Sequence, residues 1–204
     1  MPKVKVPRKS TLVDMTAMCD VSFLLLTFFM LTSNFTVKEP VIVSTPSSIS
    51  EIKIPEINIM QIIVDKDGKL FIGLDGQEKR KEWLEKVGEK NGIKFSNDEL
   101  KKFSIINSFG VPVSAMKAWL ALDPIDRDNP KNLLGVPIDT AITTKNEFAT
   151  WVRFARDINK DVRIAIKADR QTSYKTIKNL MSTLQTLKEN RYNLITSLET
   201  ASDK

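Results

Sequence analysis

One long apolar segment dominates the hydrophobic pattern near the amino terminus. No charged residue occurs over positions 21–37, and the run 23–31 is apolar on every face apart from one threonine. A helix with this pattern is not a half-exposed surface helix, because it offers water no polar side. Residues 15–37 also have about the ~20-residue length that crosses a ~30 Å hydrocarbon layer. The pattern therefore predicts a transmembrane helix over residues 15–37, interrupted by one charge at Asp20.

Basic residues cluster in the arm formed by residues 1–14, which precedes this helix. They are Lys3, Lys5, Arg8 and Lys9. A cleaved signal peptide also joins basic to apolar residues, but it ends in a small-residue site that residues 31–35 match poorly. We therefore expect an uncleaved anchor. The positive-inside rule then leaves the arm in the cytoplasm and sends the chain from Lys38 onward across the membrane.

Beyond the membrane the pattern changes to short elements. Residues 38–56 mix prolines with serines, which predicts an extended linker. Two apolar runs follow over residues 57–64 and 70–74, and the Asp-Gly turn chemistry of residues 65–69 joins them as a β-hairpin. Periodicity then predicts helices over 78–90, 98–107 and 113–122, a loop over 124–137, a helix over 147–159, a strand over 162–168, a helix over 173–189 and a strand over 192–198.

This order of elements predicts the fold class. We expect a single amino-terminal transmembrane helix followed, over residues 57–204, by a small two-layer α/β sandwich of ββαβαβ type with its helices on one face of the sheet. A mostly helical insertion of about residues 76–145 separates the hairpin from the later elements. We expect this insertion to be an added lobe that leaves the sheet intact and that a short linker could replace.

Composition narrows the possible chemistry. The 204 residues are 42% hydrophobic and 27% charged, which is typical of a folded chain rather than a disordered or polytopic one. Zero His and one Cys exclude a disulfide framework and a cysteine zinc site, and they remove the commonest general base. The net charge of +6 would permit nucleic-acid binding, but the basic residues are mostly interleaved with acids.

The region outside the membrane carries no recognisable catalytic motif. It lacks a Gly-rich phosphate loop, a nucleophile elbow and a His-based triad. Asp65 and Asp67 could suggest calcium, but the later ligands of a twelve-residue loop are missing, and we expect a turn. Asp169, Arg170 and Tyr174 at a strand end could bind a partner, although Asp169 could equally cap the following turn or helix. We therefore expect no enzyme, no cofactor, no metal and no nucleic-acid partner.

Asp20 is the candidate functional residue of the predicted transmembrane helix. A charged group at the centre of such a helix costs about 2.5 to 3.5 kcal/mol on insertion scales. Low dielectric disfavours the charged form, so the carboxyl group can be neutral or can switch near physiological pH, as a proton carrier must. The alternative is that Asp20 lies only about one turn inside the membrane and reaches the cytoplasmic headgroups.

Other polar residues share one stripe of the helix with Asp20. At about 100° per residue, Thr16 and Asn34 project about 40° and Thr27 about 20° from Asp20. A polar stripe on a lipid-like helix is expected where it packs into another protein or a watered cavity. Thr16 could equally be an ordinary helix N-cap, and Thr27 is better explained by packing between helices than by proton handling.

Two segments resemble the ExbD/TolR family of biopolymer transport proteins. The first is DMTAMCDV over residues 14–21, followed by an aromatic-rich run over 23–32, which resembles the family's transmembrane signature. The second is VRIAIKAD over residues 162–169, followed by Tyr174 and a helix over 177–184. Two departures are Ala17, where the family often has Pro, and the insertion, where the family usually has a single short helix.

The resemblance implies a role for Asp20 and a set of partners. Asp20 aligns with the membrane aspartate that is protonated and deprotonated during proton flow. The implied assembly is an ExbB-ExbD/TonB-like complex of the bacterial inner membrane, driven by the proton motive force to power outer-membrane transport. Its other members would be a polytopic ExbB/TolQ-like protein around the helix, a TonB- or TolA-like protein that receives the motion, and a second copy of this chain. The domain beyond the membrane would be periplasmic.

Three classes of function compete. The favoured one is an energy-transducing subunit in which Asp20 carries protons and the outer domain moves. The second is a passive membrane-anchored periplasmic binding or scaffold protein of TolR type, in which Asp20 only locks an assembly. The third is an anchored enzyme with its active site in the insertion, for which the sequence offers only scattered acids and a tryptophan.

Overall fold

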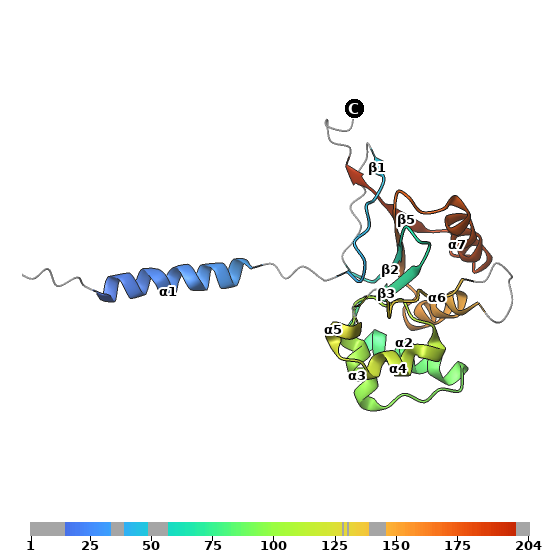
Figure 1. The fold of residues 1–204 in the computed structure, drawn as a ribbon, viewed down its shortest axis with the longest axis horizontal. Coiled ribbons are helices and arrows are strands. Elements are labelled where there is room, and N and C mark those ends of the chain that lie inside the picture. Colours follow the sequence, from blue (N-terminus) through green and yellow to red (C-terminus); the bar gives the residue numbers. More distant parts are fainter. Residues whose placement is uncertain are drawn as a thin grey trace, which may run out of the picture. The chain divides into compact units, whose positions relative to one another are not determined.

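The computed structural model describes residues 15–33, 39–48, 57–127, 129, 131–138 and 146–198. It divides into two units (Figure 1). The first unit, within residues 1–37, contains the helix α1. The second, within residues 38–204, contains a β-sheet with its covering helices.

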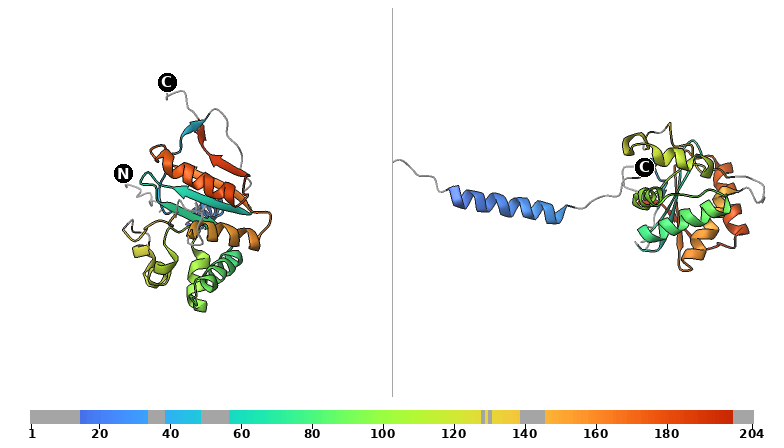
Figure 2. Two further views of the ribbon diagram at one scale, coloured as in Figure 1. Left: turned by 90° about the vertical axis from the view of Figure 1, so that its right-hand side faces the viewer. Right: turned by 90° about the horizontal axis from the view of Figure 1, so that it is seen from below.

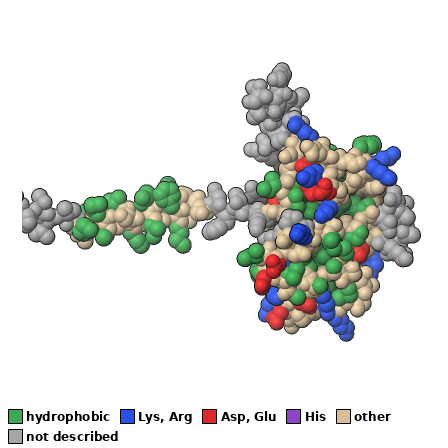
Figure 3. Space-filling view, viewed as in Figure 1, with side chains coloured by type: hydrophobic (Ala, Val, Ile, Leu, Met, Phe, Trp, Pro, Cys, Tyr) green, Lys and Arg blue, Asp and Glu red, His purple; other side chains and the backbone are tan. Residues whose placement is uncertain are grey.

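Helix α1 (Met15–Thr32) forms the first unit. Its 18 residues are apolar and long enough to cross a membrane, since a helix of that length spans about 27 Å. All its large apolar side chains are exposed within the unit, and the visible surface of the helix is mostly hydrophobic (Figure 3). A soluble helix of this composition would bury such side chains, so α1 has the properties of a membrane span. The predicted continuation over residues 34–37 lies outside the described residues.

A four-stranded sheet organises the second unit. Its order is β3 (Leu70–Leu74), β2 (Ile59–Val64), β4 (Arg163–Ala168) and β5 (Tyr192–Ile195). β2 and β3 form the predicted antiparallel hairpin, whereas β2, β4 and β5 are parallel neighbours. Gly68, with φ of 77°, takes the left-handed position in the hairpin turn, as the Asp-Gly pattern predicts.

The two faces of the sheet are covered differently. Side chains alternate along a strand, so Ile62 and Ile63 point to opposite faces, and both are fully buried. Helices α6 (Glu147–Ile158) and α7 (Tyr174–Thr186) lie on one side of the sheet (Figure 2), which confirms the two-layer α/β class. Both helices bury an apolar stripe whose spacing the sequence already shows.

Residues 39–48 lie against the other face. Lys167, which shares that face with Ile63, pairs through Nζ with the Glu39 carboxylate at 2.6 Å. Val43 is only 7% exposed and joins the hydrophobic core. The strand β1 (Ser47–Ser48) then pairs in parallel with β6 (Ser197–Leu198). This part of the predicted linker is therefore folded onto the domain, because an apolar residue and a charge pair fasten it; residues 49–56 lie outside the described range.

The predicted final strand over residues 192–198 is two strands. β5 pairs with β4, and the chain then leaves that sheet so that β6 can pair with β1. The break has a physical cause, since the pairing partner changes between Ile195 and Ser197. The local sequence pattern does not show which strand each segment pairs with, so it predicts one continuous strand.

The insertion forms a lobe of short helices. They are α2 (Gln77–Lys90), α3 (Asn97–Ile105), the 3₁₀ turn η1 (Val113–Ala115), α4 (Met116–Ala121) and α5 (Pro124–Arg127). The three predicted helices are confirmed, although the third begins as a 3₁₀ turn. The predicted loop over 124–137 is wrong over its first four residues, where the carbonyl of Arg127 accepts a hydrogen bond from Trp119 Nε1 at 3.3 Å.

The lobe shares its core with the rest of the domain. Trp83 and Phe109, from the insertion, contact Trp151 of α6 with ring centroids 4.7 Å and 4.9 Å apart. Trp83 Nε1 donates a hydrogen bond to the Trp151 carbonyl at 2.8 Å. All three rings are at most 1% exposed. The expectation that the core lies outside the insertion is therefore wrong, because the aromatic residues of the lobe and those of α6 form one cluster.

The chain returning from α3 also extends the sheet. Phe109 and Ile72 exchange two backbone hydrogen bonds, of 2.8 Å and 2.9 Å, at the open edge of β3. A Cβ on Gly73 would lie 2.2 Å from the Asn107 carbonyl oxygen, so only glycine allows this approach. Arg80, which is 7% exposed, holds the same segment by donating to the Ile106 carbonyl at 2.8 Å. Burial lowers the pKa of this guanidinium, and nearby Asp75 partly opposes that shift.

Candidate functional site

Asp20 is the one carboxyl group in α1. It lies about 8 Å along the helix axis from Met15, given a rise of 1.5 Å per residue. The continuous helix from Met15 to Thr32 brings Thr16 and Thr27 to within about 40° of Asp20 around the axis. Leu24 and Leu31 fall on the same side, so the polar stripe is interrupted by leucines. Asn34, the fourth predicted member of the stripe, lies outside the described residues.

Three hydroxyl groups of α1 donate hydrogen bonds to carbonyls of the helix itself. Ser22 Oγ donates to the Met18 carbonyl at 2.8 Å, and Thr32 Oγ1 donates to the Phe28 carbonyl at 2.8 Å. These two side chains project away from Asp20 and are not members of the predicted stripe. Thr27 Oγ1 likewise donates to the Leu24 carbonyl, at 2.9 Å. A hydroxyl that bonds back to its own helix can enter a membrane without a partner protein.

Asp20 differs from these hydroxyls. Its carboxylate forms no hydrogen bond or ion pair with another described residue, and an acceptor-only group cannot bond to the carbonyls of its own helix. A carboxylate in hydrocarbon must be protonated, hydrated or paired. The carboxyl group of Asp20 therefore requires a hydrogen-bond partner, water or a proton that α1 itself does not supply. Cys19, the neighbouring thiol, is free and exposed.

Asp169 is the second candidate position, at the end of β4. Its carboxylate accepts hydrogen bonds from the backbone N–H of Gln171 at 2.8 Å and of Ser44 at 2.9 Å. These two bonds favour the charged form and hold the pKa of Asp169 below its usual value. The Arg170 N–H in turn donates to the Ser44 carbonyl at 2.9 Å. Asp169 therefore caps the turn after β4 and fastens residues 39–48.

The other residues considered in the outer domain serve the fold. Asp65 accepts a hydrogen bond from the Lys66 N–H at 2.7 Å within the hairpin turn, as a turn residue does. Tyr174 begins α7 and is 78% exposed, and no hydrogen bond joins its side chain to Asp169. Within the described part of the chain, no three His, Cys, Asp or Glu residues come together as metal ligands would.

Comparison with known proteins gives one match. The family model described as ExbD, biopolymer transport protein ExbD/TolR, matches residues 7–199. That range includes α1, the sheet and the whole insertion. No curated protein and no solved structure matches the chain.

Proposed function

Because this chain belongs to the ExbD/TolR family of biopolymer transport proteins, we propose that it is a proton-driven energy-transducing subunit with Asp20 as its proton carrier. The carboxylate takes up a proton on one side of the membrane and releases it on the other. The resulting movement of α1 passes to the outer domain. The proposal assigns the outer domain no enzymatic activity.

The observation that carries the proposal is the unmet requirement of Asp20. The hydroxyls of Ser22, Thr27 and Thr32 all donate hydrogen bonds to carbonyls of α1 itself. A carboxyl group without such a bond is retained at a cost of a few kcal/mol in the membrane. That cost is explained if the Asp20 carboxyl group lies in a water-filled cavity of a partner protein, where it gains and loses a proton. The neighbouring stripe residues Thr16 and Thr27 give the same side of α1 its polarity.

The energy available suits a conformational drive. One charge crossing 100 mV releases about 2.3 kcal/mol, which corresponds to a change of about fifty-fold in an equilibrium constant. A shift of that size per proton is enough to bias two states of an assembly that lie close in free energy. Residues 39–48 are fastened to β4 and the turn after it, so a pull on that segment reaches the folded domain directly.

The proposed setting is the bacterial inner membrane. The basic arm of residues 1–14 would lie in the cytoplasm and the outer domain in the periplasm. Two or more copies of α1 would pack inside a polytopic ExbB/TolQ-like protein, and a TonB- or TolA-like protein would receive the motion. Reporter fusions at Lys9 and at Ser47 should then report opposite compartments, and the same compartment for both would contradict this topology.

The substitution Asp20→Asn tests the proposal. It keeps the side-chain volume and polarity while removing titration, so the complex should still assemble and transport should stop. We would measure proton-motive-force-dependent uptake or outer-membrane integrity in cells, together with co-purification of the polytopic partner. Two controls should leave most activity in place. Ser22→Ala removes a hydroxyl from another side of α1, and Asp14→Asn makes the same chemical change six residues before Asp20, nearer the basic arm.

A passive scaffold predicts the opposite result. An Asp that only locks an assembly should tolerate Asn, which is easier to insert into hydrocarbon. Full transport activity in Asp20→Asn with normal recovery of the partner would therefore reject proton transduction by this residue. Loss of the partner from Asp20→Asn would equally contradict the proposal, because the carboxylate would then act in assembly.

A further inference from the structure

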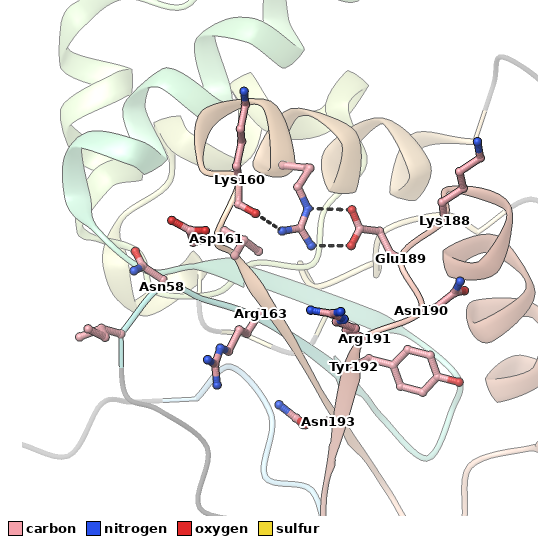
Figure 4. Close-up of a pocket in the computed structure, with 13 residues that line it drawn as sticks. Asn58, Lys160, Asp161, Arg163, Lys188, Glu189, Asn190, Arg191, Tyr192 and Asn193 are labelled. Atoms are coloured by element: carbon pink, nitrogen blue, oxygen red, sulfur yellow. Dashed lines mark hydrogen bonds and ion pairs between the residues drawn. The ribbon is translucent and has the colours of Figure 1, made fainter.

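A basic cleft lies at the amino ends of β4 and β5, at the opposite end of β4 from Asp169. It has a volume of about 970 Å³. The start of β2, the turn after α6 and the turn after α7 line it (Figure 4). Five cationic residues line it, against two acidic ones; the cations are Arg156, Lys160, Arg163, Lys188 and Arg191, and the acids are Asp161 and Glu189. The amino groups of Lys160 and Lys188 point outward at its rim (Figure 4).

One ion pair builds the wall of this cleft. The Arg156 guanidinium meets the Glu189 carboxylate with two parallel hydrogen bonds, Nε to Oε1 at 2.7 Å and Nη2 to Oε2. The remaining Nη1 donates to the Lys160 carbonyl. The Glu189 side chain is only 14% exposed, and its negative charge is neutralised by Arg156. The pair ties the turn after α6 to the turn after α7 and fixes the cleft's shape.

The other four cations have no such partner. Lys160, Arg163, Lys188 and Arg191 are all exposed, and none forms an ion pair or side-chain hydrogen bond with another described residue. Asp161 is the one remaining carboxylate on the lining. The cleft therefore presents an uncompensated positive charge in a concave site, where an anion would be attracted from several sides.

Two of these cations stand next to each other. Ile164 and Tyr192 are register partners in the parallel pair β4 and β5, so the residues before them, Arg163 and Arg191, occupy neighbouring positions at the strand starts (Figure 4). Like charges side by side on adjacent strands are destabilising. No described acid separates them, so an anion bound between them would remove that repulsion.

Backbone geometry marks the same cleft. Asn58 (φ 60°) and Lys188 (φ 62°) have left-handed backbones, and both line it. They are the two non-glycine residues with this conformation in the part of the chain that the structure describes. Lys188 follows the last residues of α7, where glycine is the usual choice. A lysine there costs conformational energy that glycine would avoid, and it places a cation on the rim.

Helix dipoles do not account for the whole cluster. Lys160 and Lys188 follow the carboxyl ends of α6 and α7, where cations are favourable. Arg163 and Arg191 belong to the strand starts and gain less from those dipoles. Both helices direct their negative ends here, and no described helix begins at the cleft, so the backbone N–H cradle typical of phosphate sites is missing. Cations spread over several turns suit separate carboxylates better than one compact phosphate.

We propose that this cleft binds an extended acidic segment of a partner protein. Its carboxylates pair with Lys160, Arg163, Lys188 and Arg191, the guanidinium groups of the two arginines taking the best-oriented contacts. The side-chain amides of Asn190 and Asn193, which also line the cleft, hydrogen-bond to the segment's backbone. The proposed binding site depends on no property of Asp20. An experiment can therefore reject peptide binding without affecting the proposal of proton transduction, and can reject proton transduction without affecting peptide binding.

The test is direct binding to the full chain in a non-ionic detergent. The probe is a fluorescently labelled peptide of eight glutamates, compared with eight glutamines. The glutamate peptide should bind at least about tenfold more tightly, and its affinity should fall between 50 mM and 500 mM NaCl because salt screens the charges. Equal binding of the two peptides would overturn the proposal.

Variants locate the site. Arg163→Gln with Arg191→Gln should weaken glutamate-peptide binding about tenfold or more, and Lys160→Gln with Lys188→Gln should weaken it by a similar factor. Lys101→Gln with Lys102→Gln removes the same charge from exposed positions on α3 and should leave binding unchanged. Equal losses in all three variants would mean that only net charge matters and would reject the site.

Competitors separate the other anions. Pyrophosphate and a soluble short-chain phosphatidylglycerol should displace the glutamate peptide only at concentrations well above that of free peptide. Displacement by pyrophosphate at lower concentrations than free peptide would make the cleft a phosphate site. The same result with the lipid would make it a membrane-surface contact, and either outcome would overturn the acidic-peptide proposal.

Discussion

At the scale of single residues, Asp169 shows what one carboxylate does for the outer domain. It accepts backbone hydrogen bonds from Gln171, two residues ahead, and from Ser44, far away in the sequence. The first bond shapes the turn after β4, and the second fastens residues 39–48 to the sheet. The same residue thereby connects the chain that follows the membrane helix to the folded domain.

Asp169→Asn should loosen that connection in a pH-dependent way. The lowered pKa of Asp169 means that its contribution to stability is complete above its ordinary value of 3.8 and is lost as the pH falls through the folded-state pKa. At pH 7 the variant should show a lower thermal midpoint and faster hydrogen exchange over residues 39–48. The difference from wild type should shrink as the pH falls below 3.8 and through the folded-state pKa, and Asp67→Asn, in the exposed hairpin turn, should show neither effect. A difference that persists unchanged at low pH would contradict this role.

Residues differ in how well their roles can be predicted from the sequence. Asp20 is recognisable because a charge inside an apolar run is rare and costly. Asp169 is ambiguous, since its decisive partner, Ser44, is 125 residues away. Arg80 gives no signal at all: it lies among the charged residues of α2 and is buried only because the chain returning from α3 packs over it.

At the scale of elements, the contact between α2 and α6 decides how the insertion joins the domain. Trp83 and Trp151 cross at 4.7 Å with their rings at 75°. Trp83 Nε1 has an acceptor in the Trp151 carbonyl, whereas Trp151 Nε1 is buried and finds none among the described residues. Both indoles are fully buried in the same contact, and they differ in that only Trp83 Nε1 has a hydrogen-bond acceptor.

Replacing each tryptophan by phenylalanine should separate packing from hydrogen bonding. Both changes leave a cavity of similar size, but Trp83→Phe also removes a satisfied donor, whereas Trp151→Phe removes an unsatisfied one. Trp83→Phe should therefore be the more destabilising by about 1 kcal/mol. Urea unfolding of both variants measures the difference, and a larger loss for Trp151→Phe would contradict the account.

Elements with a strong local signal are predictable from the sequence. β3 is confirmed at its predicted bounds because Gly68 and the Asp-Gly turn fix the hairpin, and α6 begins where Asn146 accepts a hydrogen bond from the Ala149 N–H at 3.1 Å. The strands β1 and β6 have no comparable signal. Each is two residues long, and each is a strand only because it pairs with the other, which is about 150 residues away in the sequence.

At the scale of the whole molecule, the insertion is part of the core of the outer domain. Replacing residues 77–145 by a short Gly/Ser linker should therefore abolish cooperative unfolding, because Trp151 and the edge of β3 would lose their cover. Placing the same linker after Asn91, in an exposed turn where Gly92 has open space, should keep a cooperative transition. Circular dichroism during urea unfolding reads out both variants, and a cooperative transition after the deletion would mean that the lobe is separable.

The overall organisation was predictable in outline. An apolar helix, a hairpin and a later βαβ unit follow from periodicity and turn residues. The aromatic cluster shared by the insertion and α6 was not predictable. Trp83, Phe109 and Trp151 come from three segments whose periodicity shows only that each has an apolar side. Sequence patterns show which side of an element is apolar, but not which other element it will meet.

The central claim is that Asp20 moves protons, and proton flux tests it most directly. The complex of this chain with its polytopic partner would be reconstituted into vesicles under an imposed membrane potential, and acidification would be followed with a pH-sensitive dye. Wild type should conduct protons, and Asp20→Asn, recovered in the same complex, should fall to the rate of empty vesicles while Ser22→Ala conducts normally. Undiminished proton flux in Asp20→Asn would contradict the account.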